Sequence, residues 1–175
     1  MLENFRNKMR SLSESKRIMS KLIFLKENII MFFFIIFIFF LDRFSKTFIL
    51  SNVNKNFIYI NDFINFDLIW NTGIGFGLLS FNSSLFYNLV SILIGLVVLI
   101  LIYIFLISEK YEKLIYALII GGAFGNFYDR LVYKAVPDFI DLHYDNFHWF
   151  TFNVADIFIT LGIIFYLMKD ILIKR

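Results

Sequence analysis

The segment "NIIMFFFIIFIFFLDRFSKTF", residues 28–48, is apolar almost throughout until Asp42 and then ends among charged side chains. At roughly 1.5 Å per helical residue, such a run is long enough to cross about 30 Å of hydrocarbon. Comparable apolar runs follow at about residues 85–107, 114–132 and 152–168. The chain is 59% hydrophobic and 21% aromatic, which is well outside the soluble globular range. We therefore predict an all-α integral membrane protein with four transmembrane helices.

Basic residues set the predicted orientation, because Lys and Arg near helix ends stay on the cytoplasmic side. Seven of the 17 Lys and Arg residues precede residue 28, and others lie between the second and third runs and after the last. Both termini are therefore expected in the cytoplasm. This topology explains the net charge of +3, so no nucleic-acid partner is expected. Residues 1–27 are predicted to form a basic cytoplasmic leader, and residues 28–175 the transmembrane domain.

Two connections are expected on the outer side. Residues 51–84 contain the β-leaning pieces "NFIYI" and "FDLIW", which predict a small extracytoplasmic β-like platform after the first helix. Residues 134–151 are rich in aromatic residues and are expected to lie along the membrane interface. His143 and His148 lack HExxH or other metal-ligand spacing, so we expect no metal. The absence of Cys excludes thiol nucleophiles and disulfides.

Polar residues within the apolar spans are candidates for function, because a charge in lipid is costly unless it faces protein or water. Asp42 and Lys46 lie four residues apart on one helix face and are expected to form a structural pair. Gly121 and Gly125 are expected to let a neighbouring helix approach closely. The cluster that follows them, predicted to brace the site, is Asn126, Asp129 and Arg130.

Two carboxylates are placed at the same outer level of the membrane. Asp138 lies in the outer connection, and Asp156 lies one turn into the last helix on the same face as Asn153. Two carboxylates around one water cannot comfortably both ionise, so one keeps a proton while the other acts as a base. Hydrolysis of a peptide bond without a metal needs this division of roles. Spacing alone leaves a proton relay or a structural pair open, and Asp141 is a rival for the first carboxylate.

Five sequence blocks occur in a characteristic order: "LDRFSK" (41–46), "NTGIGFG" (71–77), "GGAFGNFYDR" (121–130), "VPDFID" (136–141) and "FNVAD" (152–156). Together they resemble the lipoprotein signal peptidase family, signal peptidase II, over about residues 28–170. The resemblance implies that Asp138 and Asp156 are the catalytic aspartates. It also implies substrate contacts or supporting roles for a further set: Asp42, Lys46, Asn71, Gly73, Asn126, Asp129, Arg130 and Asn153.

The activity that this resemblance implies is that of a membrane-embedded aspartyl endopeptidase. It would remove signal peptides from bacterial prolipoproteins by cleaving before a diacylglyceryl-modified Cys. Implied partners are these prolipoproteins and membrane lipid, with no cofactor. The enzyme would be a monomer in the bacterial cytoplasmic (inner) membrane, with its site near the outer face. Arg43, Pro137 and the pair Trp149 and Phe150 depart from the usual family pattern, but none of them removes a reacting group.

Two other classes of membrane protein could also use such residues. A proton-coupled transporter would normally need charges at the membrane midplane and often shows internal repeats, and neither feature is visible. A non-catalytic membrane scaffold would depend on Gly121 and Gly125 rather than on Asp138. The sequence also lacks the Gly-x-Gly-Asp block of presenilin-like proteases and the Ser and His arrangement of rhomboids.

Overall fold

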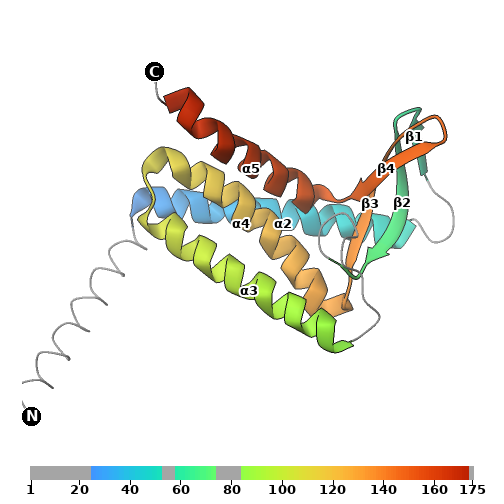
Figure 1. The fold of residues 1–175 in the computed structure, drawn as a ribbon, viewed down its shortest axis with the longest axis horizontal. Helices are drawn as coiled ribbons and strands as arrows, with labels where there is room; N and C mark the ends of the chain where they lie inside the picture. The colour runs from blue at the N-terminus through green and yellow to red at the C-terminus, as the bar shows by residue number, and fades with distance from the viewer. Residues whose placement is uncertain (1–24, 53–57, 74–83, 174–175) are drawn as a thin grey trace, which may run out of the picture.

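A computed structural model describes residues 25–52, 58–73 and 84–173. The helices there are α2 (Lys26–Asn52), α3 (Ser84–Ile107), α4 (Lys110–Tyr133) and α5 (Val154–Ile173). The strands are β1 (Ile58–Asn61), β2 (Ile64–Asn71), β3 (Val136–Tyr144) and β4 (Phe147–Phe152). The helices form a bundle, and the strands extend from one end of it (Figure 1). The leader, residues 1–24, and residues 74–77 of the "NTGIGFG" block lie outside the described residues.

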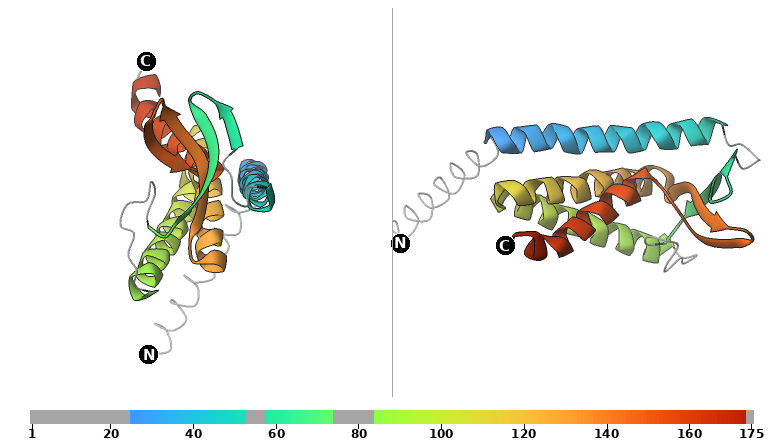
Figure 2. Two further views of the ribbon diagram at one scale, coloured as in Figure 1. Left: turned by 90° about the vertical axis from the view of Figure 1, so that its right-hand side faces the viewer. Right: turned by 90° about the horizontal axis from the view of Figure 1, so that it is seen from above.

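Helix α4 is the centre of the bundle and packs against α2, α3 and α5. Figure 2 shows α2 running along one side of α4, with α3 and α5 on the other sides. The approach is close because α4 lacks side chains at the crossings. A Cβ on Gly121 would lie 2.8 Å from Cβ of Ile38, and one on Gly125 would overlap the Asp42 carboxylate. The packing role predicted for both glycines is confirmed.

Large apolar side chains cover the outside of the bundle. Phe33, Phe44 and Leu99 are 65%, 74% and 63% exposed, respectively. So much exposed apolar surface is unfavourable in water and indicates a lipid environment. Among the described helices, α2 and the Tyr87–Ile107 part of α3 are long and apolar enough to cross a membrane. All four predicted spans are helical, although α5 begins at Val154 because Phe152 completes β4.

The four strands form one antiparallel sheet in the order β1-β2-β3-β4. Strands β1 and β2 confirm the platform predicted after the first helix. Strands β3 and β4 come from the 134–151 connection, which we expected to be an interfacial loop, so the platform is larger than predicted. The aromatic content of this connection masked a strand pattern, because aromatic residues favour strands as well as interfaces. Asp145, in the turn between β3 and β4, has a φ of 54°, as a tight hairpin requires.

The crossing of α4 and α5 gives a first prediction. A Cβ on Gly122 would overlap the carbonyl oxygen of Ala155, and backbone cannot move aside as a flexible side chain does. Gly122→Ala is therefore expected to destabilise the protein by about 1 to 3 kcal/mol, seen as a lower melting temperature in detergent. The control is Gly95→Ala, whose Cβ would lie 3.1 Å from the movable ring of Phe127. Equal effects of the two variants would contradict this account.

Candidate active site

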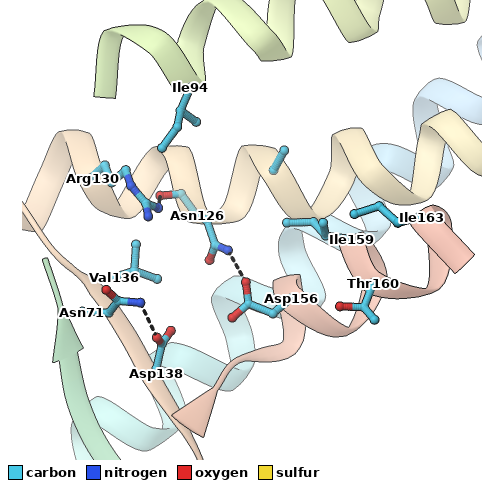
Figure 3. A pocket seen from close by; sticks show the side chains of 11 residues that line it. Asn71, Ile94, Asn126, Arg130, Val136, Asp138, Asp156, Ile159, Thr160 and Ile163 are labelled. Carbon is cyan, nitrogen blue, oxygen red and sulfur yellow. Dashed lines mark hydrogen bonds between the residues drawn. The ribbon is translucent and has the colours of Figure 1, made fainter. Parts of the chain in front are cut away.

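Asp138 and Asp156 line the same cavity, although they come from different elements. Asp138 lies on β3, and Asp156 lies in the first turn of α5. The cavity has a volume of about 300 Å³, and both carboxylates point into it (Figure 3). Its other lining residues are Asn71, Ile94, Ala123, Asn126, Arg130, Val136, Ile159, Thr160 and Ile163. The structure thus brings together the two carboxylates that the sequence singled out.

Strand periodicity removes Asp141 as a rival to Asp138. The two residues are three apart on β3, and neighbouring side chains on a strand point to opposite faces. Asp138 faces the cavity, whereas Oδ2 of Asp141 lies 2.8 Å from Nδ1 of His148 in β4. Asp141 therefore cannot share a water with Asp156.

Asn153 connects the two aspartates. It precedes α5, and its Oδ1 accepts a hydrogen bond from the backbone N–H of Asp156 at 3.1 Å. Oδ2 of Asp156 accepts one in return from the Asn153 N–H at 3.2 Å, which completes a reciprocal helix cap. The Asn153 side chain also donates from Nδ2 to Oδ1 of Asp138 at 2.6 Å. One buried residue therefore caps the helix and fixes both carboxylates.

Asn71 ties the sheet to the site. Its Nδ2 donates to Oδ2 of Asp138 at 2.8 Å, and its Oδ1 accepts from the Gly73 N–H at 2.9 Å. The Gly73 carbonyl in turn accepts from Nη2 of Arg130 at 2.9 Å, so the end of β2 is bound to α4. Gly73 itself is buried. Asn71 therefore contacts Asp138 directly, and Gly73 is connected to the site through Arg130.

Lys46 organises the helical side of the site. Its Nζ donates to Oδ2 of Asp42 at 2.9 Å, Oδ1 of Asn126 at 2.9 Å and Oδ2 of Asp129 at 2.7 Å. These bonds use all three donors of the ammonium group. Because Lys46 holds the Asn126 oxygen, Nδ2 of Asn126 is free to donate to Oδ1 of Asp156 at 2.7 Å. The predicted pair of Asp42 and Lys46 is present, and it acts on Asp156 through Asn126.

Comparisons with known proteins identify the family. A family model described as Signal peptidase (SPase) II matches residues 34–172. A lipoprotein signal peptidase of Pelagibacter ubique is 54% identical over 132 residues, which cover 74% of this chain and 80% of that protein. The chain belongs to the signal peptidase II family. A second relative, a lipoprotein signal peptidase of Francisella tularensis subsp. novicida, is 37% identical over 122 residues, which cover 67% of this chain and 76% of that protein.

The fold agrees with this membership. A solved structure titled as a bacterial membrane enzyme, at 2.3 Å resolution, matches with a TM-score of 0.67 and 27% identity over 87% of this chain and 93% of that chain. A second bacterial membrane enzyme structure, at 1.9 Å resolution, matches with a TM-score of 0.63 and 26% identity. This match covers 83% of this chain and 93% of that chain. The predicted family, and with it the class of aspartic-type membrane peptidase, is confirmed.

Arg43 is a member of the site that sequence reasoning missed. Its guanidinium donates to both carboxylate oxygens of Asp129, at 2.5 and 2.7 Å, and to Oδ2 of Asp42 at 3.0 Å. Asp42 also accepts the backbone N–H of Ala155 at 3.0 Å, near the positive end of α5. In this peptidase, two cations therefore balance two buried carboxylates. No local sequence pattern indicates this pairing, because Arg43 and Asp129 lie 86 residues apart.

Burial and a neighbouring charge raise the pKa of Asp138, the carboxyl group on β3. The peptidase buries Asp138 to 3% exposure, and this burial is the main cause that raises the carboxyl pKa to about 6, followed by the charge of Asp156. The N–H bonds from Asn71 and Asn153 oppose the rise in pKa because they favour the ionised form. Near neutral pH, the two carboxylates are therefore poised to share one proton.

The pKa of Asp138 gives a second prediction. As pH rises through about 6, the protonated fraction of Asp138 falls, which infrared spectra of its carboxyl band can follow. Asp156→Asn removes the neighbouring charge and should move this midpoint to lower pH. The shift should be partial, because burial is the larger cause of the raised pKa. Asp67→Asn, at an exposed position on β2, is the control. An unchanged midpoint in Asp156→Asn would contradict the coupling of the pair.

Lys46 gives a third prediction. Replacing it by Met leaves Arg43 as the one remaining ion-pair partner of buried Asp42 and Asp129 among the described residues. Breaking such a buried network costs roughly 3 to 5 kcal/mol. Lys46→Met is therefore expected to lower the melting temperature of the peptidase strongly. The matched control is Lys110→Met, because the Lys110 side chain is 79% exposed and its ion pair with Glu27 lies in solvent. Comparable melting temperatures for the two variants would refute the role of Lys46.

Proposed function

We propose that this chain hydrolyses the peptide bond before a diacylglyceryl-modified Cys in bacterial prolipoproteins, with Asp138 and Asp156 as its catalytic residues. One observation carries the proposal. Two carboxylates from separate elements point into one cavity and are bridged by Asn153. The family membership supports the reaction, and the cavity geometry supports the assignment of residues.

The chemistry needs one water and one shared proton. The ionised aspartate removes a proton from the water as its oxygen attacks the peptide carbonyl carbon, and the protonated aspartate donates its proton to the carbonyl oxygen. The tetrahedral intermediate then collapses. The peptide C–N bond breaks as the amine nitrogen receives the proton that the first aspartate took from the water. The other aspartate recovers its proton from a hydroxyl of the intermediate, and a carboxylic acid remains on the signal peptide. Asp138 and Asp156 exchange acid and base roles, so the reaction requires no cofactor.

The cavity lining supports a lipid-bearing substrate. Its polar end holds the two aspartates, while Ile94 of α3 and Ile159 and Ile163 of α5 make the opposite part apolar. Figure 3 shows these isoleucines on the side away from the sheet. An acyl chain placed there would stay in an apolar environment while the scissile bond meets the carboxylates. This arrangement favours an acylated Cys over an unmodified peptide.

We further propose that all four helices span the membrane, with both termini in the cytoplasm and the sheet outside. The charges of α4 support this topology, because Asp129 is fully buried and Arg130 is 5% exposed within the bundle. Lipid would instead meet side chains such as Leu131 and Val132, which are 55% and 50% exposed. The sheet and the first turn of α5, which carries Asp156, lie at one end of the bundle, whereas α2 begins at Lys26 at the other end (Figure 1). Basic residues near a helix end favour the cytoplasmic side. A monomer in the bacterial inner membrane suffices, since one chain supplies both carboxylates.

Activity measurements test the proposal. The substrate is a synthetic prolipoprotein peptide carrying a diacylglyceryl-Cys, given to detergent-solubilised protein, and product release is followed by mass spectrometry. Asp138→Asn and Asp156→Asn are each expected to lower the rate at least about 100-fold, because each removes an acid–base group. The control is Asp67→Asn, which removes an exposed carboxylate from the same sheet. This variant should cleave the substrate at the rate of the parent protein. Near-normal rates in either active-site variant would end the proposal.

A further inference from the structure

A second group of titratable side chains lies on the other face of β3. Asp141 and His143 of β3 and His148 of β4 each offer one ligand atom, and these atoms lie within 4.8 Å of one another. They belong to the hairpin that extends beyond the helix bundle (Figure 1). We propose that these three side chains bind a divalent transition-metal ion such as Zn²⁺.

Strand pairing brings the three ligands together. His143 and His148 are paired across the antiparallel strands, and their rings stack with centroids 5.2 Å apart. Oδ2 of Asp141 lies 2.8 Å from Nδ1 of His148 and 3.4 Å from Nδ1 of His143. Two imidazole nitrogens thus face one carboxylate oxygen. This donor set suits zinc, copper, nickel or iron, whereas Mg²⁺ and Ca²⁺ prefer oxygen ligands alone.

An unsatisfied buried nitrogen points to a missing ligand. His143 is only 7% exposed, and its Nδ1 has no hydrogen-bond partner among the described residues. A buried polar atom left in this way costs free energy. This nitrogen lies 3.4 Å from Oδ2 of Asp141 and within 4.8 Å of the ligand atom of His148, where an ion bound by all three side chains would satisfy it.

Asn65 can set the tautomer that metal binding requires. Its Nδ2 lies 3.4 Å from Nε2 of His143, and its Oδ1 lacks a partner within the described parts of the chain. Turning the amide by half a rotation would place Oδ1 against Nε2. His143 would then carry its proton on Nε2 and present the lone pair of Nδ1. Metal-binding histidines are commonly held in this way by a carbonyl oxygen.

The position of the cluster permits exchange with solvent. The His148 side chain is 59% exposed, whereas that of Asp141 is 8% exposed, so an ion could enter from water and keep water in its remaining positions. A bound ion would link β3 to β4 three residues along the strand from Asp138. It would lie on the face away from the catalytic cavity, so we assign it to fastening the hairpin and not to the hydrolysis.

Composition makes the test unusually clean. His143 and His148 are the two histidines of the whole chain, and the chain contains no Cys. Full-length protein is purified without a polyhistidine tag in an uncharged detergent and stripped with a chelator. Zn²⁺ is then titrated by calorimetry, and Co²⁺ by visible absorption, which reports ligand number and geometry. We expect one equivalent to bind and Zn²⁺ to raise the melting temperature.

Variants distinguish this site from general binding to acidic groups. His148→Gln, at an exposed position, should weaken Zn²⁺ binding by at least about tenfold and abolish the rise in melting temperature, and Asn65→Leu should weaken binding by about 10- to 100-fold. Asp67→Asn removes an exposed carboxylate from the same sheet and should bind as the parent protein does. Absence of saturable binding in the parent protein, or equal affinity in His148→Gln, overturns the proposal.

Discussion

The close placement of two carboxyl groups, Asp138 and Asp156, in one cavity explains most of the surrounding arrangement. A carboxylate pair of this kind repels itself, and the protein must hold both side chains against that repulsion without neutralising them. Neutral amide side chains hold the two carboxylates in place by hydrogen bonds. Asn71, Asn126 and Asn153 supply the side-chain donors to Asp138 and Asp156. Amides fix direction while adding no charge, so the acids can still share a proton.

The ammonium group of Lys46 is connected to Asp156 through the side chain of Asn126. Lys46 contacts Asn126 and not Asp156, and its other bonds go to Asp42 and Asp129. A direct ion pair with a catalytic carboxylate would stabilise its ionised form and hold it unprotonated. Placing an amide between the cation and the acid transmits orientation but weakens that electrostatic effect. The balanced cluster of Asp42, Asp129, Lys46 and Arg43 is therefore a support for the site and not part of the acid pair.

Close helix packing makes this support possible. The glycines of α4 allow α2 and α5 to approach until Asp42 reaches the backbone of Ala155, beside the cap formed by Asn153. The polar cluster, the helix cap and the sheet thus meet within one bundle end. Side chains on strand β3 alternate between its two faces, so Asp138 faces the cavity that it shares with Asp156, while Asp141 faces the two histidines. Because the carboxyl groups and their hydrogen-bond partners are already held in position, they need little rearrangement when the reaction begins.

Features that depend on local order could be predicted from the amino-acid sequence. Run length and hydropathy predicted the four helices, offsets of three and four placed Asp42 with Lys46, and the ordered blocks indicated the family with Asp138 and Asp156 as its acids. The contacts between groups far apart in the chain could not be predicted in this way and depend on the three-dimensional fold. Arg43 pairs with Asp129 across 86 residues, and Asn153 bridges to Asp138 from the end of a strand hairpin that the aromatic content concealed. Hydrophobic periodicity reports which face of an element is buried, but not which neighbour lies there. The partners of these polar groups therefore became visible only once the bundle and the sheet were assembled.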